Sequence, residues 1–232
     1  MLFFDFDGPI LNVTHRYYMA YRDALNSLGG ETLDEPTYWQ MKQRKVPVED
    51  ILAHTGVRCD VSQYRRIRNT LIERDDYLLH DRIWEQLLPV YSKLFAEQPA
   101  VLVTLRSNRE ALAEQLTRLG IVDWFENILS GPAKASERWK TKVGFVEFAF
   151  GKGTIDAGED IFFGDTETDI RAGKALGAKT VAVSFGIRDR DLLASERPDF
   201  LFDSPAELAG FISDQILKGS SAPKARPDVA IQ

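Results

Sequence analysis

The amino-acid sequence predicts an α/β protein: a Rossmann-like parallel sheet with helices on both faces, and an all-helical domain inserted near its start. Two observations carry this prediction. From Pro99 onward, strand-like apolar runs alternate with helical segments, as they do in consecutive βαβ units. Before that point, a single apolar run at Leu2–Phe4 is followed by a long stretch whose pattern is helical.

The first strand and the helix after it have clear ends. The apolar run Leu2–Phe4 leads through Asp5-Phe6-Asp7 to Gly8-Pro9, a pair typical of the loop that follows a buried strand. The apolar residues that come next recur at helical spacing: Tyr17, Tyr21, Ala24, Leu25 and Leu28. Gly29-Gly30 then ends this helix.

The following stretch, to about residue 96, keeps a helical pattern in short pieces, and no part of it is expected to be a strand. Its breaks are Pro36, Pro47, Gly56 and Pro89. We therefore predict a helical domain over 13–91, inserted into an α/β core made of 1–12 and 92–217. Residues 218–232 are rich in Ser, Pro, Ala and Lys, and are expected to form a flexible tail.

The second strand of the core is expected at Ala100–Leu105, which is apolar on both faces as a fully buried strand should be. Ser107–Glu110 reads as a capping box that starts a helix, and Gly120 ends that helix. Three leucines form its inward face: Leu112, Leu116 and Leu119.

Strands and helices alternate in the rest of the core. The expected strands are Phe125–Leu129, Asp160–Phe163, Thr180–Ser184 and Phe200–Phe202. The expected helices are Lys142–Phe150, Glu167–Leu176 and Pro205–Leu217. Because parallel strands need crossover connections, this alternation predicts a parallel sheet covered by helices on both sides.

Composition excludes several classes of protein. Among 232 residues, 44% are hydrophobic and 28% charged, which is ordinary for a folded domain, and the net charge of −6 argues against nucleic acid as the main partner. Cys59 is the single cysteine, so no intrachain disulfide can form. No apolar run is long enough to span a membrane, and the first residues lack the basic start of a signal peptide. We expect a cytoplasmic protein that is a monomer or a homodimer.

Several polar residues come directly after predicted strands. Asp5 and Asp7 follow the first strand, Thr104 ends the second, and Asp165 and Asp169 follow the strand at Asp160–Phe163. The carboxyl ends of parallel strands share one edge of a sheet, where ligands bind. Carboxylates gathered there repel one another, and Mg²⁺ is the cation expected to neutralise them. Such a site suits phosphate chemistry, with one aspartate free to act as a nucleophile.

With a lysine near residue 140, these residues form four ordered motifs. Asp5-Phe6-Asp7-Gly8, Thr104, the lysine and Gly164-Asp165 with Asp169 resemble the haloacid dehalogenase superfamily over about residues 1–215. The length of chain between Asp5 and Thr104 is similar to that of the phosphoglycolate phosphatase-like subgroup, whose helical cap follows the first motif.

The resemblance implies a role for each motif residue. Asp5 would attack phosphorus and become an aspartyl-phosphate, and Asp7 would protonate the leaving oxygen and then deprotonate the attacking water. Asp5, the backbone carbonyl of Asp7 and Asp165 would bind Mg²⁺, with Asp169 as a direct or water-mediated supporter. Thr104 and the lysine would bind the phosphoryl group. Dehalogenases lack an acid at the position of Asp7, so phosphoryl transfer is the expected chemistry.

Some substrate contacts stay open at this stage. Lys140 and Lys142 both precede the same apolar helix face, and Lys142 is favoured as the phosphate-binding lysine. Arg106 stands near the expected phosphate site, where it either adds a cation or points to solvent. Arg44 and Lys45 lie in a basic run that is either a solvated helix face or a contact to a second anionic group of the substrate.

The function expected from the sequence is Mg²⁺-dependent hydrolysis of a small phosphorylated metabolite through an aspartyl-phosphate on Asp5. One alternative is a phosphomutase resembling β-phosphoglucomutase, which would share every core motif. A second is a phospho-accepting switch protein resembling bacterial receiver domains. Receiver domains have no inserted helical cap, and a catalytically inactive interaction protein would not need all four motifs, so both are less favoured.

Overall fold

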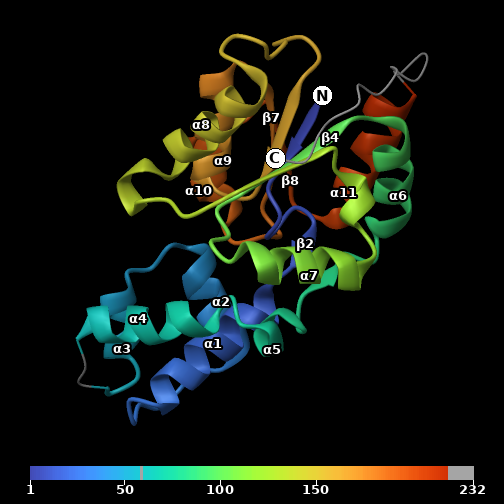
Figure 1. Ribbon diagram of the computed structural model, residues 1–232. Coiled ribbons are helices and arrows are strands. Elements are labelled where there is room, and N and C mark those ends of the chain that lie inside the picture. Colours follow the sequence, from blue (N-terminus) through green and yellow to red (C-terminus); the bar gives the residue numbers. More distant parts are fainter. Residues whose placement is uncertain (58–59, 219–232) are drawn as a thin grey trace.

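The computed structural model describes residues 1–57 and 60–218 and shows a six-stranded parallel sheet below which a helical domain projects (Figure 1). The expected tail at 218–232 falls, except for its first residue, outside the described residues. The strands lie in the order β5-β4-β1-β6-β7-β8. Their bounds are β1 Leu2–Phe4, β4 Ala100–Thr104, β5 Asn127–Ser130, β6 Ile161–Gly164, β7 Lys179–Val183 and β8 Phe200–Phe202. The predicted α/β fold with a parallel sheet is confirmed.

The first strand lies at the centre of the sheet, with Phe3 opposite Val101 of β4 and Phe162 of β6. Side chains of a strand alternate between its two faces, so Phe3 packs on one side of the sheet and Leu2 and Phe4 pack on the other. This two-sided burial explains why the strand is apolar at every position.

Helices cover both faces of the sheet. On the face of Phe3 lie α8 (Arg138–Phe150) and α9 (Glu167–Leu176), and on the opposite face lie α6 (Leu88–Glu97), α7 (Arg109–Leu119) and α11 (Pro205–Phe211). Figure 1 shows α8 and α9 on one side of the strands, and α6 and α11 on the other. The remaining core helices are α10 (Arg190–Ser195) and the short turns η1 (Val122–Trp124), η2 (Ala135–Glu137) and η3 (Ile212–Leu217).

The direction in which the chain adds strands to the sheet changes at β1. From β1 the chain runs outward through β4 to β5, and then returns to the other side of β1 for β6, β7 and β8. A crevice opens at the carboxyl ends of the strands where such a reversal occurs, and open α/β sheets bind their ligands there. The ends of β1, β4 and β6, which carry the motif aspartates and Thr104, are therefore next to one another.

The inserted domain consists of five helices around a small apolar core of its own. They are α1 (Thr14–Asn26), α2 (Glu35–Gln43), α3 (Val48–Ala53), α4 (Val61–Leu71) and α5 (Asp75–Leu78). Tyr21 and Tyr38 stack there with ring centroids 4.1 Å apart, and Leu25, Leu52 and Tyr64 pack around them. We call these five helices the cap.

Two short strands join the cap to the sheet domain. Strand β2 (Leu11–Asn12) leads into the cap, β3 (Arg82–Ile83) leads out of it, and the two pair antiparallel. The expectation of no strand between Gly30 and about residue 96 is wrong at β3, because a two-residue strand is too short to produce an alternating pattern. The end of the inserted helical domain at residue 91 remains a prediction. Tyr91, on α6, packs in the apolar core of the sheet domain.

Other elements start earlier than expected or were not expected. Helix α8 begins at Arg138, so Lys140 and Lys142 both lie within its first turns instead of opening it. Helix α10 was not expected, and the last helix passes into a π-helical turn at Ile212. Within the described ranges, no helix combines the length and the apolar character that a membrane span requires.

A buried charge network lies where the cap meets the sheet domain. Arg16 of α1 is 1% exposed and forms ion pairs with Asp7 at 2.6 Å and with Asp81 at 3.0 Å. Asp81 directly precedes β3, is fully buried and also accepts a hydrogen bond from Gln115 of α7. Arg16, near the start of the cap, therefore joins Asp81, which precedes the returning strand β3, to Asp7 in the loop after β1.

Replacing Arg16 by Met is expected to destabilise the protein by about 3 kcal/mol or more, since Asp81 and Asp7 would each lose a buried counter-charge. Urea unfolding followed by circular dichroism measures the change. Arg22→Met is the matched control, because Arg22 lies on the same helix, pairs only with its neighbour Asp23 and is partly exposed. A loss no larger than that of the control would contradict a stabilising role for the network.

Candidate active site

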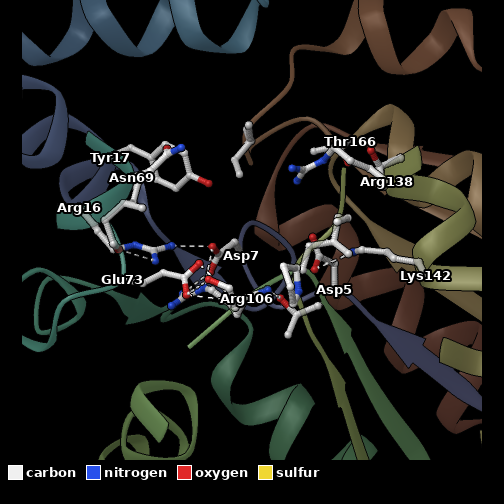
Figure 2. Close-up of a pocket in the computed structure, with 18 of the residues that line it drawn as sticks. Asp5, Asp7, Arg16, Tyr17, Asn69, Glu73, Arg106, Arg138, Lys142 and Thr166 are labelled. Carbon is white, nitrogen blue, oxygen red and sulfur yellow. Dashed lines mark hydrogen bonds and ion pairs between the residues drawn. The ribbon is translucent and has the colours of Figure 1, made fainter. Parts of the chain in front are cut away.

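A pocket of about 300 Å³ opens at the carboxyl ends of β1, β4 and β6, between the sheet domain and the cap. Asp5, Asp7, Thr104, Arg106 and Lys142 line it from the sheet domain. The cap contributes residues of α1 and α4: Arg16, Tyr17, Arg68, Asn69 and others. Figure 2 shows Asp5 and Lys142 on one side of this pocket and Asp7 with Arg16 and Arg106 on the other.

Asp5 and Asp169 share the ammonium group of Lys142. The Nζ atom of Lys142 lies 2.8 Å from Oδ1 of Asp5 and 2.6 Å from Oδ1 of Asp169, and the lysine side chain is 2% exposed. Although burial by itself lowers the pKa of Lys142, the charges of Asp169 and Asp5 raise it, so the ammonium stays protonated. Burial raises the pKa of Asp5 to about 7, against the opposing effect of Lys142.

Asp165 lies against two glycines and forms no ion pair with any cation of the described residues. Its Oδ2 accepts a hydrogen bond from the backbone N–H of Ile187 at 2.6 Å, while its buried Oδ1 has no partner among the described residues. A Cβ atom on Gly8 would lie 1.8 Å from Oδ2 of Asp165, and one on Gly186 would lie 2.3 Å from it. The carboxylate can therefore occupy this position only because both residues are glycine.

Asp169 also starts α9. Its Oδ2 accepts hydrogen bonds from the backbone N–H of Thr166 at 3.0 Å and from the Thr166 hydroxyl at 2.6 Å, which completes a capping box. Its Oδ1 accepts from Lys142. Both oxygens are thus engaged, so the geometry favours Asp169 as a supporter of the neighbouring carboxylates over a direct metal ligand.

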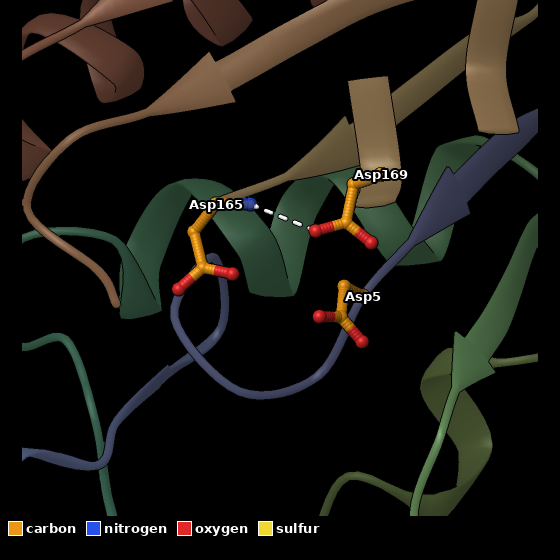
Figure 3. A group of neighbouring side chains, drawn as sticks. All are labelled: Asp5, Asp165 and Asp169. Carbon is orange, nitrogen blue, oxygen red and sulfur yellow. Dashed lines mark hydrogen bonds between the residues drawn. The ribbon is translucent and has the colours of Figure 1, made fainter. Parts of the chain in front are cut away.

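The three aspartates form a cluster that fits a divalent cation. Asp5, Asp165 and Asp169 each offer an oxygen atom within 4.8 Å of the others (Figure 3). Burial, followed by the charges of Asp5 and Asp169, raises the pKa of Asp165 well above its usual range, and the hydrogen bond from Ile187 and the charge of Arg188 oppose this only in part. The unpartnered Oδ1 of Asp165 and the all-oxygen donor set match the preference of Mg²⁺.

Asp7 is in a different environment from Asp5. Arg106 contacts both of its carboxylate oxygens, with Nε at 3.1 Å from Oδ2 and Nη2 at 2.5 Å from Oδ1, and Arg16 donates to Oδ2 at 2.6 Å. Burial alone would raise the pKa of Asp7, but Arg106 and Arg16 hold it well below its usual range. Asp7 is therefore a firmly ionised carboxylate in this structure.

The structure places the remaining motif residues as follows. Thr104 is buried at the end of β4 and lines the pocket, where its hydroxyl accepts a weak hydrogen bond from the backbone N–H of Arg106 at 3.4 Å. Arg106 is buried against Asp7 and does not point to solvent. Lys142 reaches Asp5, whereas Lys140 is exposed with its Nζ 5.7 Å from the Trp139 ring.

Neither Arg44 nor Lys45 is among the described residues that line the Asp5 pocket. Lys45 is exposed and pairs with Glu167 of α9 at 2.8 Å, and Arg44 lines a separate depression beside Asp189 and Arg190. Lys45 thus joins the cap to the sheet domain in this structure. Any contact of these two residues with substrate remains a prediction.

Sequence reasoning did not find the cap residues that line the pocket. Tyr17 carried a helical signal only, and Arg68 belongs to a basic run that is typical of a solvated helix face. Glu73 contacts the loop after Thr104, accepting hydrogen bonds from the backbone N–H groups of Ser107 and Asn108 at 3.0 and 2.8 Å. These side chains reach the site through the packing of the cap, for which the sequence has no short-range signal.

A capped α/β sheet with three aspartates and a lysine at its carboxyl edge defines the class to which the protein belongs. Residues 2–183 match the family described as Haloacid dehalogenase-like hydrolase. The match covers most of the chain, so the chain belongs to this family, and the predicted resemblance is confirmed.

Individual relatives agree with this assignment. A phosphoglycolate phosphatase from Neisseria meningitidis is 30% identical over 226 residues, covering 88% of this chain and 90% of the relative. A phosphoglycolate phosphatase from Vibrio parahaemolyticus is 23% identical over 218 residues, covering 90% and 93%. The solved structure of a haloacid dehalogenase-like hydrolase from Streptococcus pneumoniae has a TM-score of 0.70 at 18% identity, covering 90% of this chain and 96% of that one, and shares its fold.

Replacing Gly8 by Ala is expected to weaken Mg²⁺ binding at least 10-fold, because the new Cβ would displace Asp165 and the residue would be strained at its φ of +102°. Titration calorimetry with Mg²⁺ measures the affinity. Gly29→Ala is the control, since Gly29 also has a positive φ, of +72°, but an added Cβ there meets nothing within 4 Å. Equal Mg²⁺ affinity in both variants would argue against a metal site at Asp165.

Proposed function

We propose that this hydrolase is a Mg²⁺-dependent phosphatase that acts on a small phosphorylated metabolite through an aspartyl-phosphate on Asp5. The observation that carries the proposal is the position of Asp5. Its carboxylate lines the pocket, contacts the ammonium group of Lys142 and lies beside the partnerless Oδ1 of Asp165. A nucleophile, a cation for the phosphoryl oxygens and a metal position are therefore within one small volume.

Hydrolysis would proceed in two displacements at phosphorus. In the first, an oxygen of Asp5 forms a bond to phosphorus, the ester P–O bond breaks, and the leaving oxygen takes a proton from Asp7. In the second, water gives a proton to Asp7 and attacks phosphorus, and the bond to Asp5 breaks. The products are an alcohol and inorganic phosphate, and both aspartates return to their starting states.

The chain's own residues would bind and orient the phosphoryl group. Lys142, which pairs with Asp5, and the hydroxyl of Thr104 both line the pocket and are the donors expected to bind the phosphoryl oxygens. Asp5, the backbone carbonyl of Asp7 and Asp165 would hold Mg²⁺, with Asp169 in support; the ion would supply positive charge to the phosphoryl oxygens.

Arg106 and Arg16 would control the proton on Asp7. Both arginines favour the ionised carboxylate, which is the form that accepts a proton from the attacking water. When Asp7 carries a proton, the same two contacts are weaker, because a neutral carboxyl group attracts a guanidinium less strongly. Substrate binding is therefore expected to loosen these ion pairs before Asp7 acts as an acid.

The size of the pocket and the names of the relatives support a small substrate. The pocket holds about 300 Å³, at the low end for ligand sites, and the relatives from Neisseria and Vibrio are phosphoglycolate phosphatases. The cap would close over the substrate and exclude bulk water. A cytoplasmic location and a monomeric or homodimeric state remain predictions.

Asp5→Asn should abolish Mg²⁺-dependent hydrolysis of p-nitrophenyl phosphate, because an amide cannot serve as the nucleophile. Release of p-nitrophenol measures the activity, and circular dichroism checks the fold. Asp123→Asn, a change at an exposed aspartate of η1, should retain activity. Turnover by Asp5→Asn at the wild-type rate would refute the mechanism. Transfer of the phosphoryl group to a second hydroxyl without phosphate release would instead indicate the mutase alternative.

Lys142→Gln should lower kcat/KM for p-nitrophenyl phosphate about 100-fold or more, since a buried cation beside the transferred phosphoryl group is lost. Lys140→Gln is the matched control two residues away on the same helix. Lys140 is exposed, so its replacement should change kcat/KM less than twofold. The opposite ranking of the two variants would assign the phosphate-binding role to Lys140.

A further inference from the structure

Three basic side chains that form no ion pair with any described carboxylate lie around the active-site region. They are Lys42 of α2, Arg68 of α4 and Arg138 at the start of α8. No ion pair of any of the three is present among the described residues, whereas the neighbouring Arg188 pairs with Glu167 at 3.1 Å. Arg68 and Arg138 line the same pocket as Asp5.

Arg68 has unused hydrogen-bonding capacity. Its Nη2 atom is buried and has no hydrogen-bond partner among the described residues, and its Nη1 atom donates to Oδ1 of the adjacent Asn69, at 3.2 Å. The guanidinium lies 4.9 Å from the centroid of the Tyr17 ring, in the range of a cation–π contact. A buried donor without an acceptor is unfavourable, so an oxygen atom of a ligand at this position would be stabilising.

Positive charge accumulates around Tyr17. Lys42 and Arg68 lie 5.1 and 4.9 Å from its ring centroid, and Arg16 lies 5.3 Å from it. Burial, and then the charges of Arg68, Arg188 and Arg138, hold the pKa of Lys42 well below its usual range. Asp7 and Asp81 already neutralise Arg16, whereas the described residues include no carboxylate in an ion pair with Arg68 or Arg138.

The basic groups approach the pocket from both domains. Figure 2 shows Tyr17 and Asn69 of the cap on one side of the pocket and Arg138 of the sheet domain on the other, with Asp5 below Arg138. A ligand whose phosphate lies at Asp5 would therefore extend toward the cap between these groups. An anionic group at its far end would contact cations of both domains.

We infer that this pocket binds a second anionic group of the substrate, a carboxylate or a second phosphate, between the cap and the start of α8, with Arg68 as its main partner and Arg138 adding charge. This inference rests on the proposed phosphatase function and narrows its substrate class to phosphate monoesters with a second negative group. It also assigns the recognition of that group to Arg68 and Arg138 instead of Arg44 and Lys45.

Three compounds of similar length test the inference. In 2-hydroxyethyl phosphate the far end is neutral, in 2-phosphoglycolate it is a carboxylate, and in ethane-1,2-diol bisphosphate it is a second phosphate. Wild-type kcat/KM should be at least 10-fold higher for one or both of the charged compounds than for the neutral one. The compound with the higher value identifies which anion the site prefers.

Arg68→Gln should reduce that preference to about twofold or less, and Arg68→Lys should keep part of it, because charge is retained without the planar pair of donors. Arg66→Gln is the matched control, since Arg66 is an exposed arginine on the same helix, and the preference should not change. If Arg68→Gln does not fold, Arg138→Gln, at an exposed position, provides the same readout and should lower the preference at least threefold.

Calorimetric binding of the three compounds with Mg²⁺ separates this inference from the proposed function. An absence of hydrolysis with all three compounds would contradict the phosphatase function, and the ratio of their dissociation constants would still report on the second anionic group. Equal kcat/KM values and equal affinities for the neutral and charged compounds would overturn the inference. So would a preference that Arg68→Gln leaves unchanged.

Discussion

The constraint on which this structure depends is the crowding of carboxylates at the carboxyl edge of the sheet. Asp5, Asp165 and Asp169 approach one another within 4.8 Å, and Lys142 pairs with both Asp5 and Asp169. Like charges at this distance oppose folding unless counter-charges and hydrogen bonds hold them. The buried lysine, the capping box at Thr166 and the glycines around Asp165 meet that requirement, and each also shapes the candidate active site.

Two aspartates only two residues apart have opposite electrostatic surroundings. Asp5 has one lysine and two neighbouring carboxylates, and its pKa is raised, whereas Asp7 has two arginines, and its pKa is lowered. Because β1 ends at Phe4 and the chain then turns, with the backbone N–H of Leu11 bonded to the carbonyl of Phe6, Asp5 and Asp7 can lie in separate charge networks. The difference suits a division of labour between a group that bonds to phosphorus and a group that handles protons.

The sequence predicts the features that depend on local patterns along the chain, and misses those that depend on how distant segments pack together. Asp5, Thr104 and Asp165 were predictable because each follows an apolar strand and parallel strands end at one edge. Lys142 and Lys140 could not be separated without the start of α8, since residues two apart on a helix point roughly 200° apart. Arg68 and Asp81 were not predictable, because their roles depend on how the cap packs, and β3 was too short to leave a pattern.

The link that Arg16 makes between Asp7, Asp81 and the cap has a consequence for how such proteins can be recombined. A helical cap inserted between two strands looks like an exchangeable module, joined to its host by the short ribbon of β2 and β3. Here, however, the cap's first helix supplies half of the positive charge that holds a core carboxylate in place. A foreign cap without an arginine at this position would leave Asp7 with Arg106 alone, so exchanging the cap would change the electrostatics of the sheet domain as well as the cap surface that lines the pocket.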